Sequence, residues 1–163
     1  MRILFVCLGN ICRSPTVEAV ARTLAAREAP HLTLEFDSAG TAGYHSGDPP
    51  DERSQRHGAQ HGYDLSALRA RQLARADFER FDLLLAMDDD NLGAMHGIAP
   101  AKRQARARLF LSYLPVESAS ESVPDPYYGG PADFERVIEL AERGVRALFV
   151  AIAAERGVLV DNR

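Results

Sequence analysis

Two cysteines and an arginine near the start of the chain are residue types suited to covalent chemistry on a phosphate. Cys7, Cys12 and Arg13 lie in the segment Cys-Leu-Gly-Asn-Ile-Cys-Arg-Ser, residues 7–14. This segment follows an apolar run at residues 3–6 and precedes a helix-like stretch, so it joins a strand to a helix N-terminus. Backbone N–H groups and the positive end of the helix dipole converge at such a junction, and they favour both a bound phosphate and a thiolate. A thiolate beside an oxyanion cradle predicts phosphoryl transfer through a covalent cysteine intermediate.

The order of apolar patterns along the chain predicts the elements that hold this segment. Strands are expected over residues 3–6, 32–37, 83–87 and 108–111. Helices are expected from residue 14 onward, over 51–62 and 76–81, after 88–90, and over 134–152, with loops over 38–50 and 116–128. This alternation predicts an α/β fold: a single three-layer domain with a central, parallel, twisted sheet of about four strands and helices on both faces. The phosphate-binding loop then lies between the first strand and the first helix, with Cys7 at a strand carboxyl end, where such folds bind ligands.

Local signals refine these elements. Ser14 is predicted as the N-cap of the first helix and Pro15 as its first residue. The helix over 51–62 is polar and is predicted to be exposed, with Gly62 ending it. The five histidines lack the spacing of metal ligands and are interpreted as surface residues.

Composition restricts the class of protein. The chain has 163 residues, which predicts one domain over 1–163, and 46% of them are hydrophobic and 26% charged, as in soluble globular proteins. A net charge of −4 argues against nucleic acid or an anionic membrane as a partner. No apolar run approaches the roughly 18 residues that cross a bilayer. Both cysteines lie in the motif, which predicts a reduced, cytoplasmic setting and makes a poor zinc site.

Residues 7–15, Cys-Leu-Gly-Asn-Ile-Cys-Arg-Ser-Pro, closely resemble the motif of low-molecular-weight protein tyrosine phosphatases. Other segments match the same family in the right order, so that the resemblance covers nearly the whole chain. They are Asp37-Ser38-Ala39-Gly40-Thr41, Ala70-Arg71-Gln72-Leu73, Met87-Asp88 followed by Asn91, and Asp125-Pro126-Tyr127-Tyr128.

The resemblance implies hydrolysis of phosphotyrosine, in a protein or peptide, and of small aryl phosphate monoesters through a phosphocysteine. Cys7 is then the nucleophile, Arg13 holds two phosphate oxygens, and Asp125 protonates the leaving phenolate and later activates water. No metal and no cofactor are expected, phosphate-like oxyanions are expected to inhibit, and the protein is expected to be a monomer.

The resemblance also implies roles for residues around these three. Backbone N–H groups cradle the phosphate, from Leu8, Gly9, Asn10, Ile11, Cys12, Arg13 and Ser14. Ser14 can hydrogen-bond to the sulfur of Cys7, and Asn10 is tied to Ser38. Tyr44, Tyr127 and Tyr128 are expected to wall a cleft for a flat ring, with His45 beside it. Many members carry a histidine near the positions of Ala67 and Leu68 that supports the asparagine, and this chain does not, so the support of Asn10 must differ here.

Several alternatives remain open from the residues alone. Cys12 either packs or forms a reversible disulfide with Cys7 that protects the nucleophile. Asp125, between two prolines, also suits a turn. Asp88-Asp89-Asp90 suggests a metal, but an aspartate-rich helix N-terminus is the more common explanation.

Two other functions compete with the phosphatase hypothesis. Arsenate reductases share this fold; the thioredoxin-coupled kind needs further cysteines, which are absent after Cys12, whereas a kind that uses a small-molecule thiol is compatible with the sequence. A non-catalytic phosphopeptide binder needs neither Cys7 nor Asp125, and the presence of both argues against it.

Overall fold

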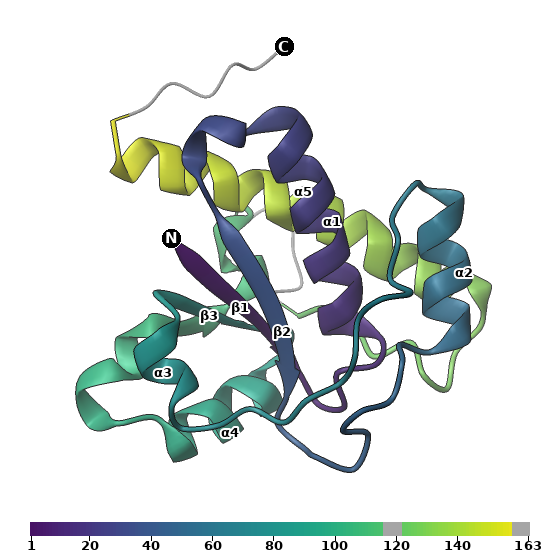
Figure 1. The fold of residues 1–163 in the computed structure, drawn as a ribbon, viewed down its shortest axis with the longest axis horizontal. Helices are drawn as coiled ribbons and strands as arrows, with labels where there is room; N and C mark the ends of the chain where they lie inside the picture. The colour runs from purple at the N-terminus through teal and green to yellow at the C-terminus, as the bar shows by residue number, and fades with distance from the viewer. Residues whose placement is uncertain (116–121, 158–163) are drawn as a thin grey trace.

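Four parallel strands in the order β2-β1-β3-β4 form the centre of the computed structural model, which describes residues 1–115 and 122–157 (Figure 1). The strands are β1 (Arg2–Cys7), β2 (Glu35–Gly40), β3 (Leu83–Ala86) and β4 (Ala107–Leu109). The helices are α1 (Arg13–Glu28), α2 (Glu52–Gln60), α3 (Asp77–Arg80), α4 (Asp89–Ile98) and α5 (Pro131–Glu155), with 3₁₀ turns at Pro30–Leu32, Ala101–Arg106 and Phe110–Tyr113. The predicted three-layer α/β architecture is confirmed. Of the loop predicted over 116–128, residues 116–121 lie outside the described residues.

Strand β1 is buried on both faces and separates two hydrophobic cores. Ile3 and Phe5 belong to the core shared with α1 and α5, whereas Leu4 and Val6 belong to the core beneath α3 and α4. Successive side chains of a strand point to opposite faces, so a continuous apolar run is what a central strand between two helical layers requires. The motif therefore begins at the end of the most enclosed strand.

The path of the chain places the end of β1 at a switch point. Strand β2 pairs with one side of β1 and β3 with the other, both in parallel. The connection after β1 thus runs to one side of the sheet and the next connection crosses to the other side. Ligands bind at such points in open α/β sheets because the loops diverge there and leave a crevice.

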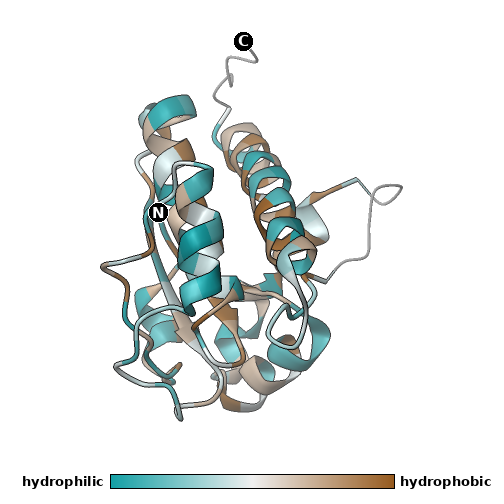
Figure 2. Ribbon diagram, turned by 90° about the vertical axis from the view of Figure 1, so that its right-hand side faces the viewer, coloured by the Kyte–Doolittle hydropathy of each residue, from teal (hydrophilic) through white to brown (hydrophobic). Residues whose placement is uncertain are grey.

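Helix α5 is amphipathic, as its sequence predicts. Its buried residues include Val137, Ala141, Val145 and Leu148, which pack into the core shared with α1. Bands of hydrophobic and hydrophilic residues alternate along it in Figure 2. Within residues 1–115 and 122–157, no helix is both long enough and apolar enough to span a membrane.

Strand β2 begins and ends later than its alternation predicts. Its last three residues, Ser38 to Gly40, pair with Phe5 to Cys7 and carry Ser38 to the end of the sheet where the motif lies. A side chain on Gly40 would put a Cβ only 2.7 Å from the carbonyl oxygen of Leu8, so a glycine is needed for β2 to run this close to the loop.

Helix α2 is not exposed all round. It ends as predicted, with Gly62 at φ +85°, but it packs on α5 and buries His57. The interpretation of all five histidines as surface residues is therefore wrong for His57. The cost of burying this ring is offset because His57 Nδ1 lies 2.7 Å from Glu135 Oε1 and the ring stacks on Phe134.

Candidate active site

Cys7 ends β1 with its side chain buried but in contact with polar groups. Its Sγ lies 3.0 Å from Ser14 Oγ, and the backbone N–H of Asn10 donates to it over 3.2 Å. Helix α1 starts at Arg13 with Cys12 at the N-cap, so the prediction of Ser14 as N-cap is wrong by two residues. The Ser14 hydroxyl lies inside the first turn and contacts the sulfur instead.

Asn10 holds the loop through three side-chain hydrogen bonds. Its backbone has φ +57°, which is strained for a residue other than glycine. Its Nδ2 donates to Ser14 Oγ at 2.8 Å and to Ser38 Oγ at 2.9 Å, and its Oδ1 accepts from the N–H of Arg71 at 3.0 Å. Ser14 Oγ accepts from Asn10, and its own hydrogen remains available for donation to the sulfur of Cys7.

The network continues from Ser38 to a buried carboxylate. The Ser38 hydroxyl donates to Glu18 Oε1 at 2.7 Å, and the guanidinium of Arg22 binds Glu18 Oε2 at 2.8 Å. Glu18 is only 1% exposed, and this burial raises the pKa of its carboxyl even though the bonds from Ser38 and Arg22 act in the opposite direction. In this chain, Asn10 is supported by the main-chain N–H of Arg71 and, through Ser38, by this carboxylate.

Arg13 is fixed by Asp88, which the sequence had indicated only as a helix cap. Its Nη1 donates to Asp88 Oδ2 at 2.6 Å and to the carbonyl of Val123 at 3.1 Å. Burial opposes the charge of Arg13, but Cys7 and Asp88 together hold the pKa of the guanidinium above its usual value. Asp88 also caps α4, since its Oδ1 accepts from the N–H of Asn91, so one aspartate positions both a helix and the arginine.

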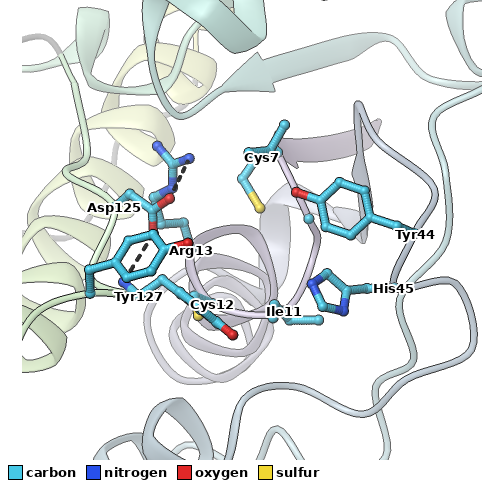
Figure 3. Close-up of a pocket in the computed structure, with 11 residues that line it drawn as sticks. Cys7, Ile11, Cys12, Arg13, Tyr44, His45, Asp125 and Tyr127 are labelled. Atoms are coloured by element: carbon cyan, nitrogen blue, oxygen red, sulfur yellow. Dashed lines mark hydrogen bonds and ion pairs between the residues drawn. The ribbon is translucent and has the colours of Figure 1, made fainter.

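Asp125 and the three tyrosines line one pocket together with the thiol of Cys7. They border a pocket of about 240 Å³ that is also lined by Cys7 and Arg13. Figure 3 shows Asp125 and Tyr127 on one side of this pocket and Tyr44 and His45 on the other. Asp125 Oδ2 lies 3.8 Å from Arg13 Nη2, and the side chain of Asp125 is 48% exposed.

Cys12 lines the same pocket in a buried position. Burial raises the pKa of this thiol to about 12, a shift that a hydrogen bond with Ser54 only partly offsets. Cys12 is therefore a protonated thiol at neutral pH and differs in kind from a nucleophile.

The structure brings the residues predicted from the sequence together in two tiers. Those that line the pocket are Cys7, Leu8, Gly9, Ile11, Cys12, Arg13, Tyr44, Asp125, Tyr127 and Tyr128. Asn10, Ser14 and Ser38 lie beneath them as buried supports. Sequence reasoning missed Glu18 and the contact from Asp88 to Arg13. The only signals were a glutamate next to the apolar face of α1 and an aspartate run directly after a buried strand.

Nearly the whole sequence is similar to that of known phosphatases. The family model for low molecular weight phosphotyrosine protein phosphatase matches residues 2–158. The chain is 40% identical over 154 residues to the low molecular weight protein-tyrosine-phosphatase YfkJ of Bacillus subtilis, covering 94% of this chain and 97% of that protein.

Solved structures extend the similarity to the fold. A protein tyrosine phosphatase of Entamoeba histolytica with Hepes in its active site superposes with a TM-score of 0.87 at 37% identity, covering 96% of this chain and 98% of that one. Vibrio vulnificus Wzb in complex with benzylphosphonate superposes with a TM-score of 0.80 at 28% identity, covering 92% and 97% of the two chains.

Proposed function

This chain belongs to the low molecular weight phosphotyrosine protein phosphatase family and is an enzyme of the protein-tyrosine-phosphatase class, and from that premise we propose that it hydrolyses phosphotyrosine and small aryl phosphates through a phosphocysteine. One observation carries the proposal: a thiol, a guanidinium and an exposed carboxyl border the same small pocket. The benzylphosphonate held by Wzb joins an aromatic ring to a phosphonate through one methylene group, and it is the kind of group that such a pocket suits.

The first step forms an S–P bond. Cys7 Sγ attacks phosphorus in line while the bond to the phenolic oxygen breaks, and Asp125 gives its proton to that oxygen. Asp88 and Val123 occupy Nη1 of Arg13, so Nε and Nη2 form the edge of the guanidinium that binds two phosphate oxygens. The loop N–H groups stabilise the charge on the same oxygens.

The second step returns the thiolate. Asp125, now ionised, takes a proton from a water that attacks phosphorus, and the S–P bond breaks to release phosphate. The hydroxyl of Ser14 stabilises the departing sulfur anion, because its hydrogen is directed at Cys7 by the bond that it accepts from Asn10. Cys7, Arg13, Asp125 and the loop supply all the groups that this cycle requires.

Hydrolysis of para-nitrophenyl phosphate and of a phosphotyrosine peptide, in reductant and EDTA, tests the proposal. We expect steady turnover by the wild type and none by Cys7→Ser. In the wild type, rapid acid quench during turnover should trap a phosphate adduct on the peptide that contains Cys7. A phosphoserine peptide of the same sequence should react roughly a hundredfold more slowly, because its phosphorus stays out of reach of the sulfur.

Two other results would overturn the proposal in different ways. Thiol-dependent formation of arsenite from arsenate, without phosphatase turnover, would assign the site to arsenate reduction. Stoichiometric phosphopeptide binding without turnover by reduced wild-type protein would make it a binding site.

A further inference from the structure

Among residues 1–115 and 122–157, the segment that carries Asp125 makes few main-chain hydrogen bonds near the acid itself. Val123 is fixed on one side, since its N–H donates to the carbonyl of Met87 at 2.7 Å and its carbonyl accepts from Arg13. Beyond it, the N–H groups of Tyr127 and Gly129 donate to Asp125 Oδ1 and to the carbonyl of Pro126, within the same turn. Side-chain contacts must therefore help to fix this turn relative to the thiol.

Arg53, on α2, makes such a contact. Its guanidinium carbon lies 5.4 Å from the ring centroid of Tyr127 and 4.6 Å from that of Phe134. The guanidinium donates to both carboxylate oxygens of Asp51, from Nε to Oδ1 at 3.1 Å and from Nη2 to Oδ2 at 2.9 Å. A guanidinium bound at two points presents a flat face in a fixed plane, which an aromatic ring can pack against.

Asp51 is in turn attached to the phosphate-binding loop. Its N–H donates to the carbonyl of Ile11 at 2.8 Å, and its Oδ1 accepts from the N–H of Arg53 and caps α2. A continuous path thus runs from Ile11 through Asp51 and Arg53 to Tyr127, two residues from the acid. Arg13 also contacts Asp125, but in the proposed cycle its free edge must bind phosphate, whereas Arg53 is not among the described residues that line the pocket.

We propose that Arg53 is a positioning residue that sets Asp125 relative to Cys7, by packing Tyr127 against a guanidinium fixed to the phosphate-binding loop. This inference rests on the proposed role of Asp125 as general acid. Arg53 does not itself touch substrate, so its loss should resemble a partial loss of the acid.

Leaving groups of different basicity report on the acid directly. Nitrophenolate leaves with little help from a proton, whereas phenolate needs one. We expect Arg53→Ala to lower kcat/KM about tenfold for phenyl phosphate and only about twofold for para-nitrophenyl phosphate. Arg53→Lys should recover only part of the loss, because an ammonium has no flat face. Arg56→Ala, which removes an exposed arginine from the same helix, should leave both substrates unchanged.

A second background separates this inference from the proposed function. In Asp125→Asn, the further change Arg53→Ala should have no added effect if Arg53 acts through the acid. An equal loss on both substrates, or a full added loss in Asp125→Asn, would overturn the role of Arg53. Arg53→Lys gives the same comparison if Arg53→Ala does not fold. If Asp125→Asn itself shows no preference for the better leaving group, it is the proposed acid that fails, and with it the premise.

Discussion

The two halves of the site are built in opposite ways. Residues 7–14 are contiguous in sequence, and their side chains Cys7, Asn10 and Ser14 are almost fully buried in a network of short hydrogen bonds. Asp125 comes from a distant part of the chain and is about half exposed. It contacts the first half through a 3.8 Å ion pair with Arg13, while the neighbouring Tyr127 packs against Arg53 of α2.

This difference follows from what each half does in the proposed cycle. The thiolate and the phosphate cradle work best when they are fixed before substrate arrives, because groups that need no reorganisation stabilise the transition state most. An acid that exchanges protons with a leaving group and then with water needs access to solvent. Stability and activity should therefore be lost together in the loop half and separately in the acid half.

Asp125→Asn should break activity alone. We expect kcat/KM for phenyl phosphate to fall by roughly 10²–10³-fold, since general acid catalysis contributes about that much. The free energy of unfolding in urea should change by less than about 0.5 kcal/mol, because a half-exposed ion pair contributes little to stability. A loss of stability of several times that size would show that the acid half is as integral to the fold as the loop.

Asn10→Ala should damage both properties. The change removes three hydrogen bonds and leaves the polar partners Ser14, Ser38 and the N–H of Arg71 buried without them. We expect a loss of about 2–3 kcal/mol in urea unfolding and roughly a tenfold to hundredfold loss in kcat/KM for para-nitrophenyl phosphate.

Asn10→Gly is the matched control for backbone strain. Glycine adopts φ +57° without cost, whereas alanine there costs about 1 kcal/mol, so the glycine variant should be the more stable by that amount while it loses as much activity. If glycine restored activity as well, the side-chain bonds of Asn10 would be irrelevant to the chemistry.

The same contrast explains what the sequence could predict. The loop half is a contiguous motif after an apolar strand. The residue types and spacing in this one short stretch were therefore enough to predict a loop at a strand–helix junction. The parallel sheet and the two helical layers followed from the alternation of patterns, because few architectures satisfy it, whereas the strand order was not predicted.

The remaining contacts depend on where distant segments meet. Asp88 shows only its capping role in sequence, because nothing local says that Arg13 lies within reach of its other oxygen. Arg53 resembles any arginine of a polar helix until α5 and Tyr127 are placed against it. The donor to Asn10 Oδ1 is the main chain of Arg71, and a main-chain group leaves no signature of residue type.

Cys12→Ser should have the smallest effect on activity in reductant. It tests whether the loop half also protects Cys7 against irreversible oxidation. In reductant we expect kcat/KM within about threefold of wild type, since a serine fills nearly the same volume. Peroxide should oxidise Cys7 to a sulfenic acid. Cys12 lines the same pocket and can condense with it, giving a disulfide and water, once the Cys12 thiol gives up its proton. Wild type treated with peroxide and then with dithiothreitol should therefore recover several times more activity than Cys12→Ser, which would progress to the irreversible sulfinic acid. Equal recovery would leave Cys12 as a packing residue. The mass of the tryptic peptide that spans the loop distinguishes the disulfide from the sulfinic acid.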